Sequence, residues 1–294
     1  MPNNYFDEFI ENALREDIGD GDHTSRACIP GDAIGKAQLL VKEEGILAGV
    51  DVAVRIFSKL DPDIKIDIIK QDGDLVSPPD IAFIVEGKVL ALLKAERLVL
   101  NIMQRMSGIA TTTRQYVNRL SGLKTRILDT RKTTPGMRML EKSAVKTGGG
   151  ENHRFGLYDM ILIKDNHIDF AGDIPSAIKR TQEYLKKTGR NLSIEIEARN
   201  LDDVSTILCI GGIRRIMLDN FTLENTRKAV KMIAGRFETE SSGGITFENI
   251  RDYAECGVDY ISVGALTHHI KSLDLSFKAL NYKPDEFGPT HLYL

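Results

Sequence analysis

The sequence predicts an α/β protein in which a small antiparallel sheet precedes a barrel of parallel strands. In the second half of the chain, strand-like stretches alternate with helical patterns, as in a series of βα units. Five of these stretches run from apolar residues into polar or glycine-rich ones, always in that direction. Residues 25–93 show β signals separated by turns instead. These observations predict two parts with different architectures.

Composition limits the class of protein. The chain has 294 residues, a formal charge of −3 and 42% hydrophobic residues, which is typical of a soluble protein with one large or two medium domains. The acidic N-terminus and the lack of a long apolar run predict a cytoplasmic protein without membrane contact. The slightly acidic balance argues against nucleic-acid binding. Cys28, Cys209 and Cys256 are far apart and are expected to be free thiols.

In the first part, apolar residues at helical spacing predict a short helix over 5–17. Three β stretches follow, at 33–50, 64–76 and 80–93. A long helical pattern then covers 95–120, with an expected interruption at Ser107-Gly108, so that we expect one broken helix or two abutting helices.

In the second part we expect strands at 126–132, 160–167, 194–200, 214–220, 237–244 and 260–266. Helices are expected at 136–147, 174–187, 201–209, 222–234 and 246–256. Six strands are visible rather than eight, so either two are hidden or the barrel is incomplete. A further helix is expected at LDLSFKALN, residues 273–281, and the tail from Asp274 is expected to pack back on the N-terminal sheet.

Charged side chains close four of these strands. Arg131 and Lys132 follow the first strand, Lys164 the second, and Glu197 and Asp219 the next two. Because the carboxyl ends of parallel strands lie on one rim, we expect a pocket for a polyanion with a metal-binding edge. The alternative for Arg131 and Lys132 is a pair of solvated loop cations.

Two of the carboxylates have alternatives. Glu195 and Glu197 alternate within one strand, and we expect one of them to face the interior and the other a helix. Glu197 takes the site role because it is nearer the strand's end. The segment Asp219-Asn220 also suits the cap of the next helix, with Asn220 or Thr222 as the capping residue.

The histidines are less specific. His153-Arg154 follows a glycine run that permits many conformations, so its place is open. His268 and His269 follow the sixth strand, and at least one of them is expected to be an ordinary surface histidine.

Glycine-containing loops follow the last two strands, at 241–244 and 263–265. Such loops often bind phosphate through backbone N–H groups, because glycine allows a close approach. Either loop alone is weak evidence for a phosphate site, and the evidence is stronger when the loops are taken together with the charged strand ends.

At these motifs the chain resembles the quinolinate phosphoribosyltransferase family, also called the carboxylating nicotinate-nucleotide pyrophosphorylases. The resemblance extends from residue 16 to 268. It implies an N-terminal α/β open sandwich, residues 1–115, and an incomplete TIM-like α/β barrel, residues 116–274, with the tail 275–294 on the sandwich. The matching segments are EDIGDGDHTS, AERLVLNIMQRMSGIAT, DTRKTTPGMRMLEKSAVKTGGGENHRFGLYDMILIKDNHI, IEIEA, IMLDNF, ESSGG and GVDYISVGALTH.

The resemblance also implies roles for individual residues. Lys132, Glu197 and Asp219 would be catalytic, and Glu197 and Asp219 would hold Mg²⁺, directly or through water and pyrophosphate. Arg97 would enter the pocket of a neighbouring subunit, with an ion pair to Glu96 as the alternative. The substrate-binding residues would be Arg97, Thr130, Arg131, Lys132, His153, Arg154, Lys164, Glu197, Asp219, Ser242, Gly243, Gly244, Val263, Gly264, Ala265 and His268.

The implied reaction joins quinolinate to phosphoribosyl pyrophosphate and gives nicotinate mononucleotide, pyrophosphate and CO₂, a step of NAD biosynthesis. The implied assembly is a homodimer with shared sites, with a hexamer left open. Three alternatives remain: a Schiff-base lyase that uses Lys132 or Lys164, a non-catalytic anion-binding protein, and a nicotinate phosphoribosyltransferase. The excess of cations favours a dicarboxylate substrate over nicotinate.

Overall fold

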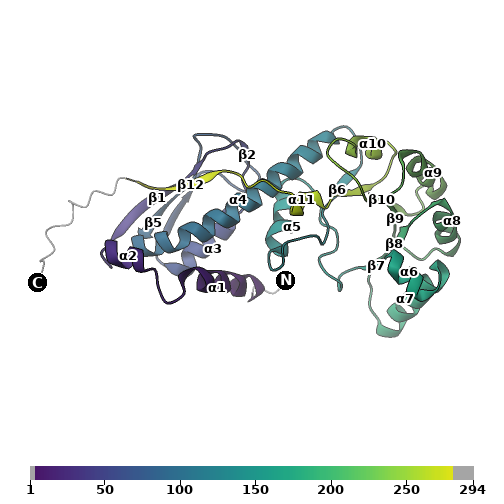
Figure 1. Cartoon of the computed structure of the whole chain (residues 1–294), viewed down its shortest axis with the longest axis horizontal. Coiled ribbons are helices and arrows are strands. Elements are labelled where there is room, and N and C mark those ends of the chain that lie inside the picture. Colours follow the sequence, from purple (N-terminus) through teal and green to yellow (C-terminus); the bar gives the residue numbers. More distant parts are fainter. Residues whose placement is uncertain (1–3, 281–294) are drawn as a thin grey trace, which may run out of the picture. The chain divides into compact units, whose positions relative to one another are not determined.

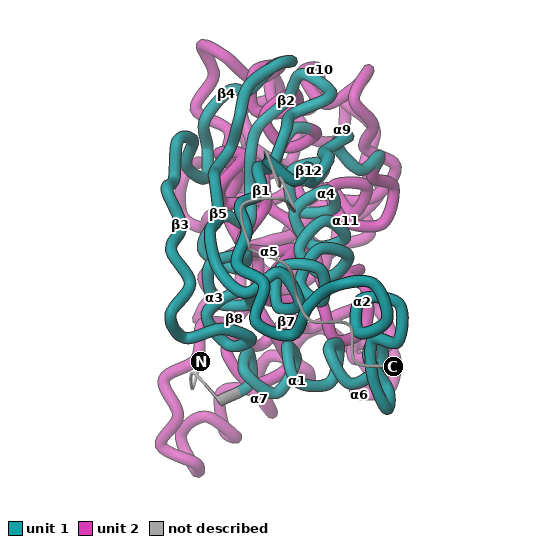
Figure 2. Tube along the Cα trace, turned by 90° about the vertical axis from the view of Figure 1, so that its left-hand side faces the viewer, with its two compact units in different colours: residues 1–111, 271–294 teal, residues 112–270 magenta. Residues whose placement is uncertain are grey.

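The structure is a computed structural model that describes residues 4–280, and it confirms the α/β class (Figure 1). The chain divides into two compact units, residues 1–111 with 271–294 and residues 112–270 (Figure 2). The sequence placed its domain boundary between residues 115 and 116. Both positions lie within one helix, α4 (Val89–Arg119). No helix in the described part of the chain combines the length and the apolar character that a membrane span needs.

The first unit is built on an antiparallel sheet of four strands in the order β12-β1-β5-β3. The aromatic ring of Phe57 on α3 lies 6.0 Å from that of Phe83 and 5.9 Å from that of Phe277, so α3 packs on the sheet. The elements are α1 (Asn4–Ile18), α2 (His23–Cys28), β1 (Ile34–Val41), β2 (Gly45–Ile46), α3 (Val50–Leu60), β3 (Lys65–Ile68), β4 (Leu75–Val76), β5 (Ile81–Lys88) and β12 (Leu275–Leu280).

The helix expected at 273–281 is wrong, because residues 275–280 form strand β12. This strand pairs antiparallel with β1, with Phe277 opposite Leu39. Leu275 and Phe277 are buried two residues apart, the period of a strand, and the edge of β1 supplies the hydrogen-bond partners. The rest of the tail, 281–294, lies outside the described residues.

The interruption expected at Ser107-Gly108 is also wrong, because α4 continues through both residues. The Ser107 hydroxyl accepts the Ala48 N–H at 2.9 Å and donates to the Ala48 carbonyl at 3.2 Å. A Cβ added to Gly108 would lie 2.2 Å from the carbonyl oxygen of Lys271. These two small residues therefore allow neighbouring backbone to approach the helix.

The second unit contains a parallel sheet of six strands in the order β6-β11-β10-β9-β8-β7, which confirms the six strands expected. In the described residues, β6 and β7 are the two edges, so the barrel is incomplete. An isolated parallel bridge between Leu128 and Glu151 continues the sheet by one residue beyond β6. The strands are β6 (Arg126–Leu128), β7 (Ile161–Ile163), β8 (Ile194–Ala198), β9 (Arg215–Asp219), β10 (Glu238–Ser242) and β11 (Tyr260–Ser262).

The helices of this unit follow one another around the outer side of the curved sheet (Figure 1). Two of them, α6 and α11, were missed by the sequence analysis, because each is short and begins at a strand's charged or glycine-rich end. The helices are α5 (Arg138–Thr147), α6 (Asp165–Ala171), α7 (Ile174–Thr188), α8 (Leu201–Ile210), α9 (Leu223–Ile233), α10 (Ile250–Ala254) and α11 (Ala265–His268). With the helices outside, the carboxyl ends of the strands are left to line a pocket.

Candidate active site

A pocket of about 780 Å³ lies at the carboxyl ends of the strands of the second unit. Except for Arg97 and Val263, every substrate-binding residue expected from the sequence lines it. The lining residues are Thr130, Arg131, Lys132, His153, Arg154, Leu162, Lys164, Asp165, Glu197, Met217, Asp219, Asn220, Ser242, Gly243, Gly244, Ile245, Thr246, Ser262, Gly264, Ala265 and His268. Val263 is buried directly after β11, and Arg97 is exposed on α4 in the other unit.

One side of the pocket is cationic. Arg131, Lys132, Arg154 and Lys164 come from three different loops, and burial together with the charge of Arg131 lowers the pKa of Arg154. The Nε–H of Arg131 is buried and has no hydrogen-bond partner within the part of the chain that the structure describes. A buried guanidinium donor without a partner is costly, and an anion in the pocket would satisfy it.

The carboxylates follow next along the rim, on β8 and β9, the next two strands after β7 in the sheet. The Glu197 carboxylate accepts from Lys164 Nζ at 2.6 Å and from the Asp165 N–H at 3.2 Å. Burial and the negative charge of Glu197 raise the pKa of Asp219. The cap of α9 is Thr222, whose hydroxyl accepts the Asn225 N–H at 3.2 Å, so capping does not occupy Asp219. Two carboxylates that repel each other at a pocket edge form a donor set suited to a hard divalent cation.

Glycine is required at Gly243 in the phosphate-type loops and allows close side-chain contacts at Gly264. Gly243 has φ +84°, and a Cβ there would lie 2.3 Å from the Asn220 side chain. A Cβ on Gly264 would lie 2.9 Å from the His268 ring and 3.0 Å from the Lys132 side chain. Both loops therefore bring their backbone next to side chains that line the pocket. The Thr267 hydroxyl also donates a hydrogen bond to the Lys132 carbonyl at 2.7 Å.

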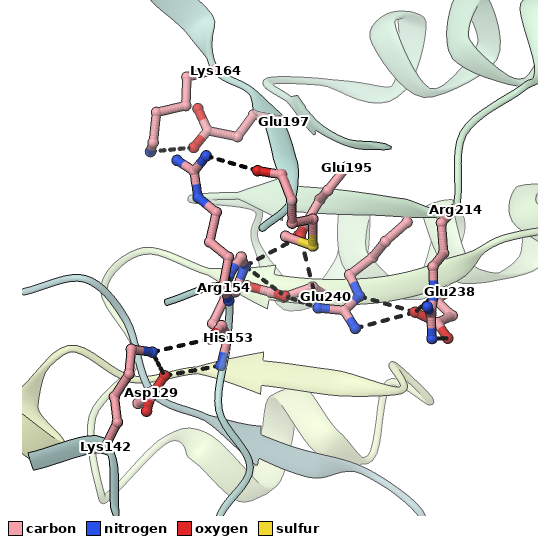
Figure 3. Close-up of polar contacts among 12 residues, drawn as sticks. Asp129, Lys142, His153, Arg154, Lys164, Glu195, Glu197, Arg214, Glu238 and Glu240 are labelled. Carbon is pink, nitrogen blue, oxygen red and sulfur yellow. Dashed lines mark hydrogen bonds and ion pairs between the residues drawn. The ribbon is translucent and has the colours of Figure 1, made fainter. Parts of the chain in front are cut away.

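The His153-Arg154 segment, whose place the sequence left open, is fixed by a buried ion pair between Asp129 and Lys142 (Figure 3). The Asp129 carboxylate also accepts the His153 N–H at 2.9 Å, and Lys142 Nζ donates to the His153 carbonyl at 3.0 Å. Burial raises the pKa of Asp129 and lowers that of Lys142, each against the attraction of the other. The backbone of residue 153 is thus held on both its polar groups.

The ring of His153 is held as well. Its Nδ1 accepts the Arg154 N–H at 2.7 Å, so the ring proton is assigned to Nε2. Nε2 lies 3.2 Å from a Glu195 oxygen and 3.6 Å from a Glu240 oxygen. Burial lowers the pKa of His153, which favours the neutral ring. The Arg154 side chain extends from here toward Lys164 and Glu197 (Figure 3).

Glu195 corrects the sequence analysis, which placed only one of Glu195 and Glu197 inside. Residues two apart on a strand point the same way, and both glutamates face the interior, 0% and 5% exposed. Below the rim, Arg215 Nη1 lies 2.9 Å from Glu240 and 3.7 Å from Glu195. The sequence contained a signal for these residues, because a charged residue occurs two positions before a rim residue on β8 and β10 and four positions before one on β9.

Other residues that the sequence analysis missed support the loop after β6. Buried Glu141 accepts from the Thr134 N–H at 3.2 Å, and Arg138 donates to the Thr133 hydroxyl at 3.0 Å. After the neighbouring strand β11, His268 is exposed and its Nδ1 lies 2.7 Å from that of His269. The arrangement can hold a dianion at its cations, and a phosphorylated group together with a metal cation at its glycine loops and carboxylates.

Two family profiles match the chain. Residues 22–107 match "Quinolinate phosphoribosyl transferase, N-terminal domain", and residues 109–278 match "Quinolinate phosphoribosyl transferase, C-terminal domain". The chloroplastic nicotinate-nucleotide pyrophosphorylase (carboxylating) of Arabidopsis thaliana is 45% identical over 284 residues, which cover 92% of this chain and 81% of the relative. The probable enzyme of that name from Bacillus subtilis is 44% identical over 269 residues, 92% and 91% of the two chains. The crystal structure of NadC from Streptococcus pyogenes is similar with a TM-score of 0.89 and 37% identity, covering 96% of this chain and 99% of that one.

We predict that Glu240→Gln changes how stability depends on pH. Burial beside Glu195, opposed by His153, Arg215 and the Ser262 hydroxyl, raises the pKa of Glu240 from 4.5 to about 8. The folded protein therefore holds this proton more tightly, and the stabilisation is complete below the unfolded pKa and is lost as the pH rises through the folded one. Glutamine stays neutral. The free energy of unfolding of the variant, relative to that of the wild type, should therefore increase as the pH rises from about 5 to about 9.

Urea unfolding across this range measures the difference. Glu238→Gln is the matched control, because the pKa of Glu238 is lowered and its contribution is lost only below that range. Parallel stability curves for the wild type and Glu240→Gln would contradict the buried environment described for Glu240.

Proposed function

The chain belongs to the quinolinate phosphoribosyltransferase family, and from this premise we propose how its pocket carries out the family's reaction. The enzyme joins quinolinate to phosphoribosyl pyrophosphate and forms nicotinate mononucleotide, pyrophosphate and CO₂, a step of de novo NAD biosynthesis. One observation supports the assignment of roles most strongly: a single pocket brings guanidinium and ammonium groups together with carboxylates and glycine loops.

The cationic side would bind quinolinate, which carries two carboxylates on a planar ring. Arg131 and Arg154 are suited to hold these carboxylates through paired N–H donors, and the unpartnered Nε–H of Arg131 is one of them. Lys132 and Lys164 would add positive charge, and His153 a neutral ring. Holding both carboxylates fixes the plane of the ring and aims its nitrogen at the reacting carbon.

The glycine loops would bind phosphoribosyl pyrophosphate. Ser242, Gly243 and Gly244 follow β10 and the segment 263–265 follows β11, so their backbone groups are next to each other on the rim. Thr130 and His268 would border the same substrate from the β6 loop and from α11. Backbone N–H groups and a hydroxyl suit phosphate oxygens because they donate without occupying much space.

Mg²⁺ is the proposed cofactor, with Glu197 and Asp219 holding it directly or through water and pyrophosphate. The donor set fits, because both groups are oxygen ligands and the repulsion that raises the pKa of Asp219 would be relieved by a cation. When bound, Mg²⁺ would offset negative charge on the departing pyrophosphate. Lys164 now partners Glu197, so some rearrangement of this contact would accompany binding.

The chemistry itself asks little of a general base. The pyridine nitrogen is already a nucleophile; its lone pair forms the bond to the ribose C1 while the bond from C1 to pyrophosphate breaks. Positive charge develops at C1, and the carboxylates of Glu197 and Asp219 would favour it and orient the ribose hydroxyls. The 2-carboxylate then leaves as CO₂, its electron pair stays on the positively charged ring, and a proton replaces it at that carbon.

Two alternatives from other classes explain the site less well. A Schiff-base lyase needs an uncharged lysine, whereas Lys164 is paired with Glu197 at 2.6 Å. The position of Lys132 among other cations equally suits an anion clamp. A protein that only binds anions would not need the carboxylate edge. The nearest competitor within the enzyme class is a nicotinate phosphoribosyltransferase, which would need fewer cations.

We predict that the protein releases pyrophosphate from phosphoribosyl pyrophosphate with quinolinate and Mg²⁺, and that nicotinate replaces quinolinate poorly. The reason is that nicotinate lacks the second carboxylate, which leaves a buried cation without its partner. Coupled pyrophosphate release measures both substrates, and ¹⁴CO₂ from carboxyl-labelled quinolinate shows decarboxylation. Equal or faster turnover with nicotinate would reject the proposal, and substrate trapping by borohydride would point to the lyase.

Arg131→Ala and Arg154→Ala should each weaken quinolinate binding by a large factor, on the order of a hundredfold if the lost contact is a desolvated, charge-assisted pair. Isothermal titration with quinolinate gives the affinity. Arg180→Ala, a cation of α7 outside this pocket, is the matched control. Unchanged quinolinate affinity in both pocket variants would remove these arginines from the site.

Asp219→Asn and Glu197→Gln should lower turnover more than quinolinate affinity, because each keeps its shape and loses the charge assigned to the metal and to the transition state. Steady-state kinetics over a range of Mg²⁺ concentrations separate the two effects. Turnover near that of the wild type at saturating Mg²⁺ would count against this role for the carboxylates.

We also propose a homodimer in which Arg97 completes the partner's pocket, with a hexamer as the further possibility. Arg97 is exposed in the first unit, whereas the other proposed ligands belong to the second. Mixing inactive Arg97→Ala and Lys132→Ala subunits should restore about a quarter of the sites on random dimerisation. A site built within one chain, with Arg97 paired to Glu96 instead, would give no recovery.

A cytoplasmic location is proposed as well. Cys28, Cys209 and Cys256 are free thiols, which suits a reducing compartment. Fractionation of cells that express the chain would test the location, and recovery with an oxidising compartment would contradict it.

A further inference from the structure

A buried polar cluster lies behind the cationic side of the pocket. It consists of His153, Glu195, Arg215 and Glu240, and only His153 also lines the pocket. Glu195 and Glu240 are 0% exposed, and the Arg215 side chain is 12% exposed. The reaction described above assigns no role to Arg215 or to Glu240, so their burial needs another explanation.

The contacts of Arg215 tie three strands together. Its guanidinium contacts Glu240 at 2.9 Å and Glu238 at 3.1 Å, both on β10, and lies 4.0 Å from the centre of the Tyr260 ring on β11. Arg215 itself belongs to β9. A guanidinium with several partners has little freedom, so the Glu240 carboxylate beside it is also held in one place.

Glu240 in turn faces the imidazole of His153. The carboxylate and the ring nitrogen Nε2 are 3.6 Å apart, and Glu195 approaches the same nitrogen to 3.2 Å. These are ion-pair distances without the alignment of a hydrogen bond, so the glutamates confine the neutral ring by close packing. On its other side, the ring accepts the N–H of Arg154 at 2.7 Å. The ring therefore links the cluster to the backbone from which Arg154 enters the pocket.

We propose that Arg215 and Glu240 are positioning residues for the dicarboxylate site: they hold the His153 ring, and the ring holds the Arg154 backbone so that the guanidinium meets a substrate carboxylate. The inference rests on the proposed role of Arg154 in quinolinate binding. It assigns the cluster to one substrate, because His153, the member that lines the pocket, contacts the backbone of Arg154.

A metal site is the other use that this group of residues suggests. One ligand atom each from His153, Glu195 and Glu240 lies within 4.8 Å of the others. However, the Arg215 guanidinium is already the cation of this group, at 2.9 Å from Glu240 and 3.7 Å from Glu195. A second cation would be repelled by it, so the positioning role explains the contacts better.

The test compares Glu240→Gln with Glu238→Gln. Both changes remove one carboxylate that contacts Arg215, but Glu238 has no contact with His153 in the described residues. Glu240→Gln should raise the quinolinate Kd on the order of tenfold and leave the KM for phosphoribosyl pyrophosphate unchanged. Glu238→Gln should change neither. Unchanged quinolinate affinity in a folded Glu240→Gln protein, or equal losses for both substrates, would overturn the proposal.

Arg215→Lys is the second variant, in case Glu240→Gln does not fold. Lysine keeps the charge but lacks the planar guanidinium that contacts Glu240 while lying over the Tyr260 ring, so quinolinate affinity alone should again fall. Wild-type affinity in this variant would overturn the proposal.

A spectroscopic measurement does not depend on any substrate. ¹⁵N NMR of the imidazole, assigned with His153→Gln, should show the proton on Nε2 in the wild type. A proton on Nδ1 would contradict the contact with Arg154 and with it the proposal. If the wild type shows the expected tautomer but does not bind quinolinate, the proposed function fails and the positioning geometry stands, so the two failures are distinguishable.

Discussion

A buried ion pair between Asp129 and Lys142 is the interaction on which the cationic side of the pocket depends. Asp129 comes from the end of β6 and Lys142 from α5, and together they bind the N–H and the carbonyl of His153. The segment around His153 has no regular secondary structure of its own beyond one bridge at Glu151. Without the ion pair, the backbone of His153 would lose both of these contacts, and the Arg154 guanidinium would keep its hydrogen bond to the Met160 carbonyl at 3.3 Å.

Such a pair is expensive to bury, and burial alone does not make it stabilising. Its use here is one of position, because the two charges also satisfy backbone groups that would otherwise be buried without partners. The same logic repeats below the rim, where Arg215, Glu195 and Glu240 surround the ring of the same residue. The interior of the open barrel is therefore polar on this side, and its charges fix side chains that meet the substrate.

The sequence predicted the rim well, since a parallel strand that ends in Lys164, Glu197 or Asp219 places that residue at a known edge. It did not predict the ion pair beneath the rim, because Asp129 directly follows β6 and Lys142 belongs to α5, and their contact depends on how the two elements pack. Glu195 was predictable from the two-residue period and was misjudged. The strand at 275–280 was taken for a helix because its partner, β1, is about 235 residues away in the sequence. The continuity of α4 was not predicted, because a Ser-Gly pair is typical of a helix interruption. The contacts of Ser107 with Ala48 and of Gly108 with Lys271, which explain the two small residues, depend on tertiary packing.

The measurement that tests this account most directly is the quinolinate affinity of Lys142→Met, taken where the variant is folded. Removing one partner of a buried ion pair should lower the free energy of unfolding by about 3–5 kcal/mol. The account further predicts that quinolinate affinity falls on the order of tenfold or more, because the backbone of His153 loses a donor and Arg154 is no longer fixed. Lys146→Met, at an exposed lysine of the same helix, should change neither quantity. A folded Lys142→Met protein that binds quinolinate as the wild type does would contradict the account.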